Sequence, residues 1–210
     1  NNIQGAGDVG AIPNNYPGFQ SVTDPVNQAK FSQAWGREID LETGITKVRA
    51  LEQAGDQIRA MIIDGENTVV TDPEREHCER ALEALDFLVV CDLFMTETAE
   101  FADVVFPATG FGETDGTQTN TERRVQRLKK AVPPPGEAKP DWWIISRLAQ
   151  RMNFEGFDYA GADEVFNELC SLSGTYAGLS WDRVEFGEYQ WPVPEEGHPG
   201  TPMVHEDGFI

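Results

Sequence analysis

Three short apolar runs, separated by helical patterns, occupy the middle of the chain. The runs are residues 58–63 (IRAMII), 86–91 (DFLVVC) and 102–106 (ADVVF). Between the first two, Asp72-Pro73 caps a helix that reaches Leu85, and a short helix over 96–101 precedes the third. Strand–helix–strand–helix–strand with short links predicts parallel strands with right-handed crossovers. We therefore expect an α/β fold with three αβα layers, in which helices flank a mostly parallel, Rossmann-like sheet.

The remaining pattern is weaker and more varied. The first twenty residues are rich in Gly, Asn and Pro, which predicts an irregular loop. Further helices are expected over 25–35 after the capping Asp24, over 45–54, 141–152 and 162–170. The segment from Gly187 is rich in Pro, Gly and Glu. We expect one domain over 1–186, incomplete because an upstream segment is absent, and a linker over 187–210.

Length and composition indicate a folded domain. A chain of 210 residues with 40% hydrophobic residues suits one core. A run of about eighteen apolar residues is missing, so a membrane span is not expected. The start has no signal-peptide pattern and no Met, which suggests an excised segment. The cysteines Cys78, Cys91 and Cys170 form no Cys-x-x-Cys pair, so free thiols in a reducing cytoplasm are expected rather than a metal site.

The chain is strongly acidic. It has 36 Asp plus Glu against 16 Lys plus Arg, a net charge of −20. This charge repels polyanions and disfavours nucleic acid as a partner. Two interpretations remain, adaptation to high salt or an acidic face that docks on a basic subunit. Because the acids are spread along the chain, we favour salt adaptation, a halophilic character.

Polar residues follow the first two predicted strands, at the edge where open parallel sheets bind ligands. Gly65-Glu66-Asn67 combines a backbone free to approach a ligand with side chains able to bond a base or ribose. An ordinary turn explains the same residues. Cys91-Asp92 ends the second strand, and Asp92 can accept two hydrogen bonds from guanine or from ribose hydroxyls. Capping of the next helix is an equal alternative for Asp92, and a buried structural thiol is the favoured interpretation of Cys91.

The third strand leads to a polar turn and the main basic cluster of the chain. The turn has hydroxyls at Thr114, Thr117 and Thr119, which can donate to phosphate or pterin oxygens. The cluster consists of Arg123, Arg124, Arg127, Lys129 and Lys130. It indicates either anion binding or a solvated hairpin face with internal salt bridges. The scattered histidines support no metal site, and we nominate no catalytic residue.

Several of these segments resemble one family in the same order along the chain. They are DGEN (64–67), FLVVCDLFMTETAEFADVVFPATGFGETDGT (87–117), NTERRVQ (120–126) and PPGEAKPDW (134–142). The opening NNIQGAGDVGAIPNNYPGFQ and the closing HPGTPMVH (198–205) match as well. Together they resemble the catalytic alpha subunit of molybdenum- or tungsten-dependent formate dehydrogenases, in the molybdopterin oxidoreductase family.

The resemblance implies one of two pseudo-symmetric α/β domains, each holding one molybdopterin guanine dinucleotide. The linker would lead to the C-terminal dinucleotide-binding domain. The cofactor contacts implied are Gly65, Glu66, Asn67, Cys91, Asp92, Thr96, Thr114 and Asp141. Cys91 stands where relatives often carry Gln or Ser. Thr114 replaces a Lys of related nitrate reductases, which removes one phosphate charge contact.

The resemblance also implies an oxidoreductase that converts formate to carbon dioxide at a molybdenum or tungsten centre. The metal is bound by two pterin dinucleotides, and electrons leave through an iron–sulfur cluster. This chain supplies neither the metal ligand nor the cluster cysteines, so it is expected to position the cofactor and to be inactive alone. Its expected partners are the rest of the polypeptide and an electron-transfer subunit, in the cytoplasm.

Two other functions stay open at this point. A nitrate reductase-like enzyme shares the NTERRVQ and GEAK segments, whereas GETDG and NNIQG favour formate. The other alternative is a non-catalytic interaction module that has kept the fold and lost the cofactor. Binding of a guanine nucleotide separates this module from either enzyme.

Overall fold

The computed structural model describes residues 3–187, 189–206 and 208. The chain divides into two compact units. One, here the hairpin unit, comprises Asn1–Gly44, Asp115–Lys129 and Asp158–Ile210; the other, here the sheet unit, comprises Ile45–Thr114 and Lys130–Phe157. Each unit has its own buried cluster of apolar side chains, so each is described by itself.

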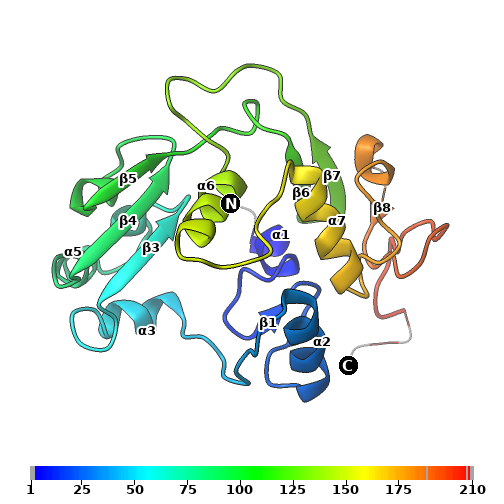
Figure 1. Ribbon diagram of the computed structural model, residues 1–210, viewed down its shortest axis with the longest axis horizontal. Coiled ribbons are helices and arrows are strands. Elements are labelled where there is room, and N and C mark those ends of the chain that lie inside the picture. The colour runs from blue at the N-terminus through cyan, green and yellow to red at the C-terminus, as the bar shows by residue number, and fades with distance from the viewer. Residues whose placement is uncertain (1–2, 188, 207, 209–210) are drawn as a thin grey trace. The chain divides into compact units, whose positions relative to one another are not determined.

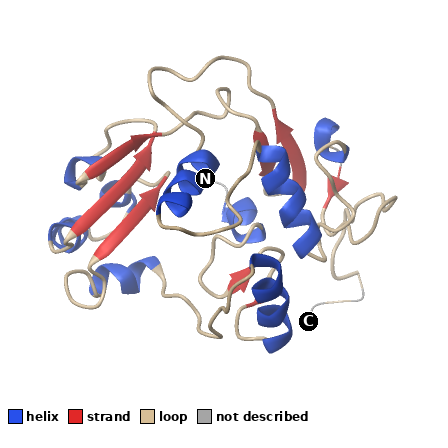
Figure 2. Ribbon diagram, in the orientation of Figure 1, coloured by secondary structure: helices blue, strands red, loops and turns tan. Residues whose placement is uncertain are grey.

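The sheet unit is built on three parallel strands, as the sequence predicts. They are β3 (Ala60–Asp64), β4 (Phe87–Asp92) and β5 (Val104–Pro107), in the order β3-β4-β5 (Figure 1). The helical elements are α3 (Lys47–Glu52), α4 (Thr68–Thr71), α5 (Arg75–Glu83), η1 (Ala99–Phe101) and α6 (Asp141–Arg151). Strand and helix alternate along the chain, which confirms the α/β class (Figure 2).

Alternation along the strands directs side chains to two faces of this sheet. Ile63, Leu88 and Val90 are buried in the core cluster with Leu51 of α3 and Leu82 of α5. The apolar runs therefore have two roles. They form the strands, and alternate residues of these strands pack with the helices in one core.

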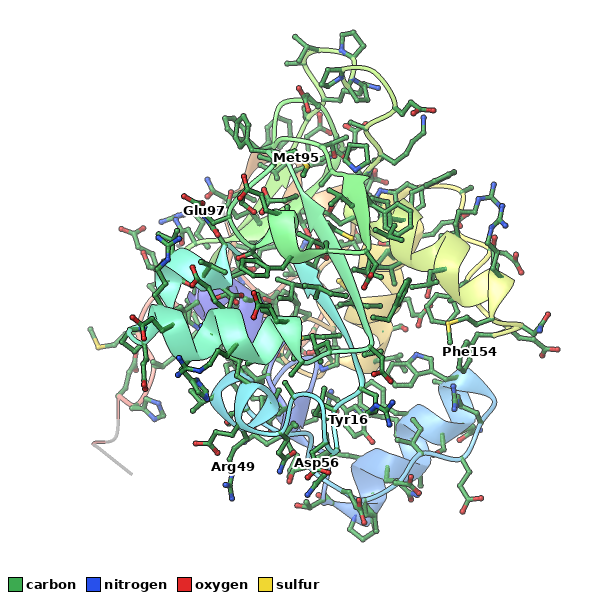
Figure 3. The ribbon with its side chains drawn as sticks, turned by 90° about the vertical axis from the view of Figure 1, so that its left-hand side faces the viewer. Tyr16, Arg49, Asp56, Met95, Glu97 and Phe154 are labelled. Carbon is green, nitrogen blue, oxygen red and sulfur yellow. The ribbon has the colours of Figure 1, made fainter. Side chains whose placement is uncertain are left out.

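The helix boundaries of this unit differ from the sequence prediction. The helix expected over 45–54 is shorter, and α4 was not expected. The helix expected to start at Pro73 begins at Arg75, because the Asp72 carboxylate accepts a hydrogen bond from the Glu74 backbone NH at 3.2 Å and closes a turn first. Arg49 on α3 and Asp56 in the following turn both lie at the surface (Figure 3).

The hairpin unit holds a second, antiparallel sheet, of which the sequence suggested only the hairpin at the basic cluster, as one of two interpretations. It consists of β6 (Gly116–Thr119), β7 (Arg124–Leu128) and β8 (Tyr189–Gln190), in that order. The other elements are α1 (Ile3–Asp8), β1 (Asn15–Tyr16), β2 (Gln20–Ser21), α2 (Pro25–Trp35), α7 (Ala162–Leu172) and η2 (Arg183–Phe186). Val125, Phe166, Tyr176 and Val193 share its core.

The prediction of an irregular loop over the first twenty residues is wrong. This stretch contains α1 and the β1–β2 pair. The carboxylate of Asp8, fully buried at the end of α1, accepts hydrogen bonds from Gln4 at 2.7 Å and from the Trp191 indole at 2.5 Å. The segment from Gly187, a linker by composition, contributes β8 and the buried Val193. Both segments gain order from partners far away in sequence, which composition does not reveal.

The basic cluster lies on the β6–β7 hairpin and its partners within this unit. Lys129 pairs with Glu185 at 2.6 Å, and the guanidinium of Arg127 stacks 4.0 Å from the ring of Trp181. Arg123 donates to the backbone oxygens of Trp191 and Pro202. These contacts support the interpretation as a hairpin face with internal salt bridges rather than an anion site.

Within the described ranges, no helix has the length and apolar character that a membrane crossing requires.

Candidate functional site

The carboxyl ends of the parallel strands gather polar side chains at one edge of the sheet unit. Asp64 ends β3 and lies opposite Cys91 of β4, and the Gly65 backbone NH donates to the Cys91 carbonyl at 2.9 Å. Asp92 is the last residue of β4 and lies opposite Pro107. The edge therefore carries two carboxylates on neighbouring strands, as parallel pairing requires.

A third carboxylate is brought to the same edge by a segment distant in sequence. Lys139 pairs with Ala108 in a parallel bridge beyond β5, and its backbone NH donates to the Pro107 carbonyl at 3.0 Å. Pro140 is the N-cap of α6, and Asp141 is the first residue of this helix. We call Asp64, Asp92 and Asp141 the carboxylate cluster.

Burial and mutual repulsion disturb the ionisation of this cluster. Desolvation, followed by the charge of Asp64, raises the pKa of Asp141 to about 6. Desolvation and the charge of Asp92 raise the pKa of Asp64 as well. Asp64 as a residue is exposed, so solvent screens its charge more than that of the half-buried Asp141. Asp141 is therefore the member of the cluster most in need of a partner.

The hydrogen bonding of Asp141 also indicates that this carboxylate lacks a partner. Its Oδ1 atom is buried and has no hydrogen-bond partner among the described residues. An unpaired buried acceptor costs free energy, on the order of 1–3 kcal/mol, that a bound donor recovers. A hydrogen-bond donor from a ligand fits this position.

Cys91 is a buried, protonated thiol. Only 3% of its surface is exposed, and desolvation with the nearby charges of Asp64 and Asp141 raises its pKa to about 11. At neutral pH the thiolate is scarce, so the residue is not a nucleophile.

Gly65, Glu66 and Asn67 turn the chain away from β3. Gly65 has a φ of +64°, a conformation that favours glycine, although a Cβ there would meet nothing within 4 Å. Glu66 pairs with Lys47 at 3.0 Å. The Asn67 amide oxygen accepts from the Thr98 hydroxyl at 2.9 Å, and its nitrogen donates to the Glu97 carboxylate at 2.7 Å (Figure 3 labels Glu97). These contacts hold the loop after β4 against the loop after β3.

The remaining predicted residues lie in the loops after β4 and β5. One oxygen of Asp92 accepts from the Leu93 backbone NH at 2.6 Å, which is the local capping considered as an alternative. The Thr96 hydroxyl accepts from the Ala99 NH at 3.3 Å at the start of η1. Thr114 is half-buried at the end of the loop that follows β5. These contacts leave the second carboxylate oxygen of Asp92 outside the local cap.

Two residues of this edge were not nominated from the sequence. Asp64 occupies the strand end just before Gly65, where its acidic character was a usable signal. Thr109 follows β5 and is 8% exposed, with a hydroxyl that has no hydrogen-bond partner among the described residues. A threonine in a turn carries no such signal, because its isolation depends on burial.

This arrangement accepts hydrogen bonds and repels anions. Among the described residues, no group of three or more His, Cys, Asp or Glu is placed to hold a metal ion. Carboxylates suit a neutral ligand rich in N–H or O–H donors, such as guanine with N1–H and N2–H₂, or a ribose diol. The guanosine end of a dinucleotide thus fits the cluster, whereas its pyrophosphate does not.

The chain is similar in sequence to several known proteins. The chain is 44% identical over its whole length to the F420-dependent formate dehydrogenase subunit alpha of Methanocaldococcus jannaschii, covering 31% of that protein. It is 42% identical to a putative formate dehydrogenase of Bacillus subtilis, covering 21% of it. The chain thus spans about a third or less of the length of these relatives.

A solved structure and a family model complete the comparison. Acetylene hydratase from Pelobacter acetylenicus superposes with a TM-score of 0.54 at 23% identity, over 74% of this chain and 22% of the other, and this likeness concerns the fold. Residues 1–151 match the model of the molybdopterin oxidoreductase family. Because this match covers well over half of its residues, the chain belongs to the molybdopterin oxidoreductase family.

Proposed function

We propose that this chain is the cofactor-positioning part of a formate dehydrogenase catalytic subunit. The parent enzyme would oxidise formate to carbon dioxide at a molybdenum or tungsten centre carried by two molybdopterin guanine dinucleotides. Two relatives with formate dehydrogenase in their names, at 44% and 42% identity over the whole chain, support this choice over a nitrate reductase. The bound metal would supply the two-electron chemistry, and this chain would supply binding and orientation.

The unpaired Oδ1 of Asp141 is the observation that carries the proposal. A buried acceptor beside two further carboxylates suits the N1–H and N2–H₂ donors of guanine. Ionised Asp141 would accept these donors, and the ligand would shield its charge from water. The cost of leaving the oxygen unpaired in the free chain would then be recovered on binding.

The other nominated residues would support this contact indirectly. Gly65 provides the turn after β3, while Asn67 fastens the two loops through Thr98 and Glu97. Glu66, Thr96 and Thr114 would line the path of the dinucleotide, and the Cys91 thiol would lie beneath it as an uncharged wall. The pyrophosphate would extend away from the cluster, because three carboxylates at one edge disfavour its charge.

The rest of the reaction would require other parts of the parent polypeptide. The metal ligand and the iron–sulfur cluster would lie in those parts, a separate electron-transfer subunit would accept the electrons, and the chain alone would be inactive. Its net charge of −20 fits a cytoplasm of high salt content. On that hypothesis, the midpoint of thermal unfolding rises between 0.1 and 2 M sodium chloride by more than uncharged osmolytes of equal osmolality produce.

Nucleotide titration tests the proposed function directly. Guanosine diphosphate is added to the isotope-labelled chain while backbone amide shifts are followed by NMR, with adenosine diphosphate as the control ligand. We expect guanine-selective shifts at Gly65, Asn67, Asp92 and Asp141. A well-folded chain that responds to neither nucleotide, or equally to both, contradicts the proposal and favours an interaction module.

A further inference from the structure

Two buried polar atoms without a hydrogen-bond partner among the described residues belong to the edge of the sheet unit that carries the carboxylate cluster. Five buried side-chain atoms lack a hydrogen-bond partner among the described residues, and both Thr109 Oγ1 and Asp141 Oδ1 belong to this small set. Because most buried polar groups in folded proteins are paired, each exception calls for an explanation. A shared explanation is simplest for two exceptions that belong to one edge of the sheet.

The backbone places these two residues on neighbouring segments at the edge of the sheet. Ala108 and Lys139 pair in a parallel bridge, and the Ala108 NH also donates to the Asp92 carbonyl at 3.0 Å. Thr109 follows the first bridge residue, and Asp141 comes two residues after the second. Paired strands lie about 4.8 Å apart, so the two residues belong to adjacent backbone segments. They nevertheless do not bond each other, since both atoms are unpaired.

Their chemistry is complementary to one edge of guanine. An ionised carboxylate only accepts hydrogen bonds, whereas a threonine hydroxyl can donate one. Guanine presents a donor, N1–H, directly beside an acceptor, O6. Adenine presents the reverse order, an acceptor N1 beside an amino donor, and would place its N1 lone pair against the carboxylate.

The other orphan hydroxyl of this unit does not compete for this role. Thr68 is also unpaired, but it is only 1% exposed and sits in the four-residue helix α4. Thr109 keeps 8% of its surface accessible in the loop that follows β5. Of these two hydroxyls, that of Thr109 is therefore the one placed at the edge that carries the carboxylate cluster.

We propose that the Thr109 hydroxyl donates a hydrogen bond to O6 of a bound guanine whose N1–H is accepted by Asp141. This inference rests on the proposed function and adds a specificity-determining residue to its site. This contact explains why the buried Thr109 hydroxyl has no partner in the free chain, because its partner is the ligand.

The isosteric variant Thr109→Val separates a ligand contact from a structural one. It removes an unpaired hydroxyl, so we expect the midpoint of thermal unfolding of the free chain to stay equal or to rise by about 2–4 °C. The affinity for guanosine diphosphate should fall about 5- to 10-fold, as expected for one lost hydrogen bond. Thr109→Ser keeps the hydroxyl and should recover most of that affinity.

Three nucleotides assign the contact, with affinities measured by calorimetry on the 210-residue chain. Inosine diphosphate has O6 and N1–H but no amino group, so Thr109→Val should weaken it by the same factor as guanosine diphosphate. A loss that disappears with 2′-deoxyguanosine diphosphate would assign Thr109 to the ribose and overturn the base contact.

The remaining outcomes distinguish this inference from the function on which it rests. If wild type binds guanosine diphosphate and Thr109→Val binds it equally well, the Thr109 contact is overturned and the proposed function stands. If wild type binds no guanine nucleotide, both fall. If the valine variant unfolds at a clearly lower temperature, the hydroxyl has a structural partner and the inference fails.

Discussion

Replacing Asp141 by Asn is expected to stabilise the ligand-free chain at neutral pH. The folded chain raises the pKa of this carboxyl from 3.8 to about 6. A difference of this size corresponds to about 3 kcal/mol of unfavourable interaction in the charged form. Because the side chain is only half-buried, solvent screening reduces the expected gain to about 1–2 kcal/mol.

The stability difference between Asp141→Asn and wild type depends on pH. Between pH 3.8 and about 6 the folded chain keeps a proton on Asp141 that the unfolded chain releases. Stability is therefore lost as the pH rises through this window, and the loss is complete above it. Asn carries no charge and escapes this loss, so the two proteins should differ above pH 6 and converge near pH 4.

Thermal unfolding from pH 4 to 8 at constant ionic strength measures this difference. At pH 7 the variant should unfold about 2–8 °C above wild type. Asp56→Asn is the matched control, because Asp56 is exposed in a turn of the same unit (Figure 3) and its replacement should change little. A pH-independent difference between wild type and Asp141→Asn, or a less stable variant at pH 7, would refute the argument.

Three further expectations follow from the structure. Because ionised Asp141 accepts the guanine donors, the affinity for guanosine diphosphate should fall below about pH 6, which calorimetry across pH 5 to 8 detects, and a flat profile contradicts it. Trp191→Phe removes the indole donor to the fully buried Asp8 and should cost about 1–3 kcal/mol in urea unfolding, whereas an unchanged midpoint would show that the bond contributes nothing. All three cysteines are buried, and burial raises the pKa of Cys91 to about 11. A thiol reagent at pH 7 should therefore label no cysteine in the folded chain and all three after unfolding. Rapid labelling of the folded chain contradicts this expectation.

The local pattern of the sequence was sufficient for the parallel strands and for several helix ends. Runs such as FLVVC are short, apolar and rich in β-branched and aromatic residues, which favours strands, and β4 lies within one residue of its predicted bounds. Asp24 caps α2 through the Val26 NH at 2.8 Å, as the Asp-Pro pair predicts. These features depend on interactions between residues close together along the chain, so they can be predicted from sequence.

Several elements of the hairpin unit could not be predicted from such local patterns. Its first helix is glycine-rich and six residues long, and it is fastened through Asp8 to Trp191 at the other end of the chain. The β8 strand is only two residues long and exists because β7 offers it an edge. Short elements of this kind are stable only through tertiary contacts, which leave no periodic signal.

The candidate site could be predicted from the sequence in part, and the rest of it became visible only in the tertiary structure. By itself, the sequence placed Asp92 at a strand end and, through the family resemblance, marked Asp141 as a cofactor contact. Only the tertiary structure put Asp141 near Asp64, buried its oxygen without a partner, and left the Thr109 hydroxyl unpaired at the same edge of the sheet. Proximity across strands, desolvation and missing partners belong to the assembled edge of the sheet, so the chemistry of the site was decided by the fold and not by any single motif.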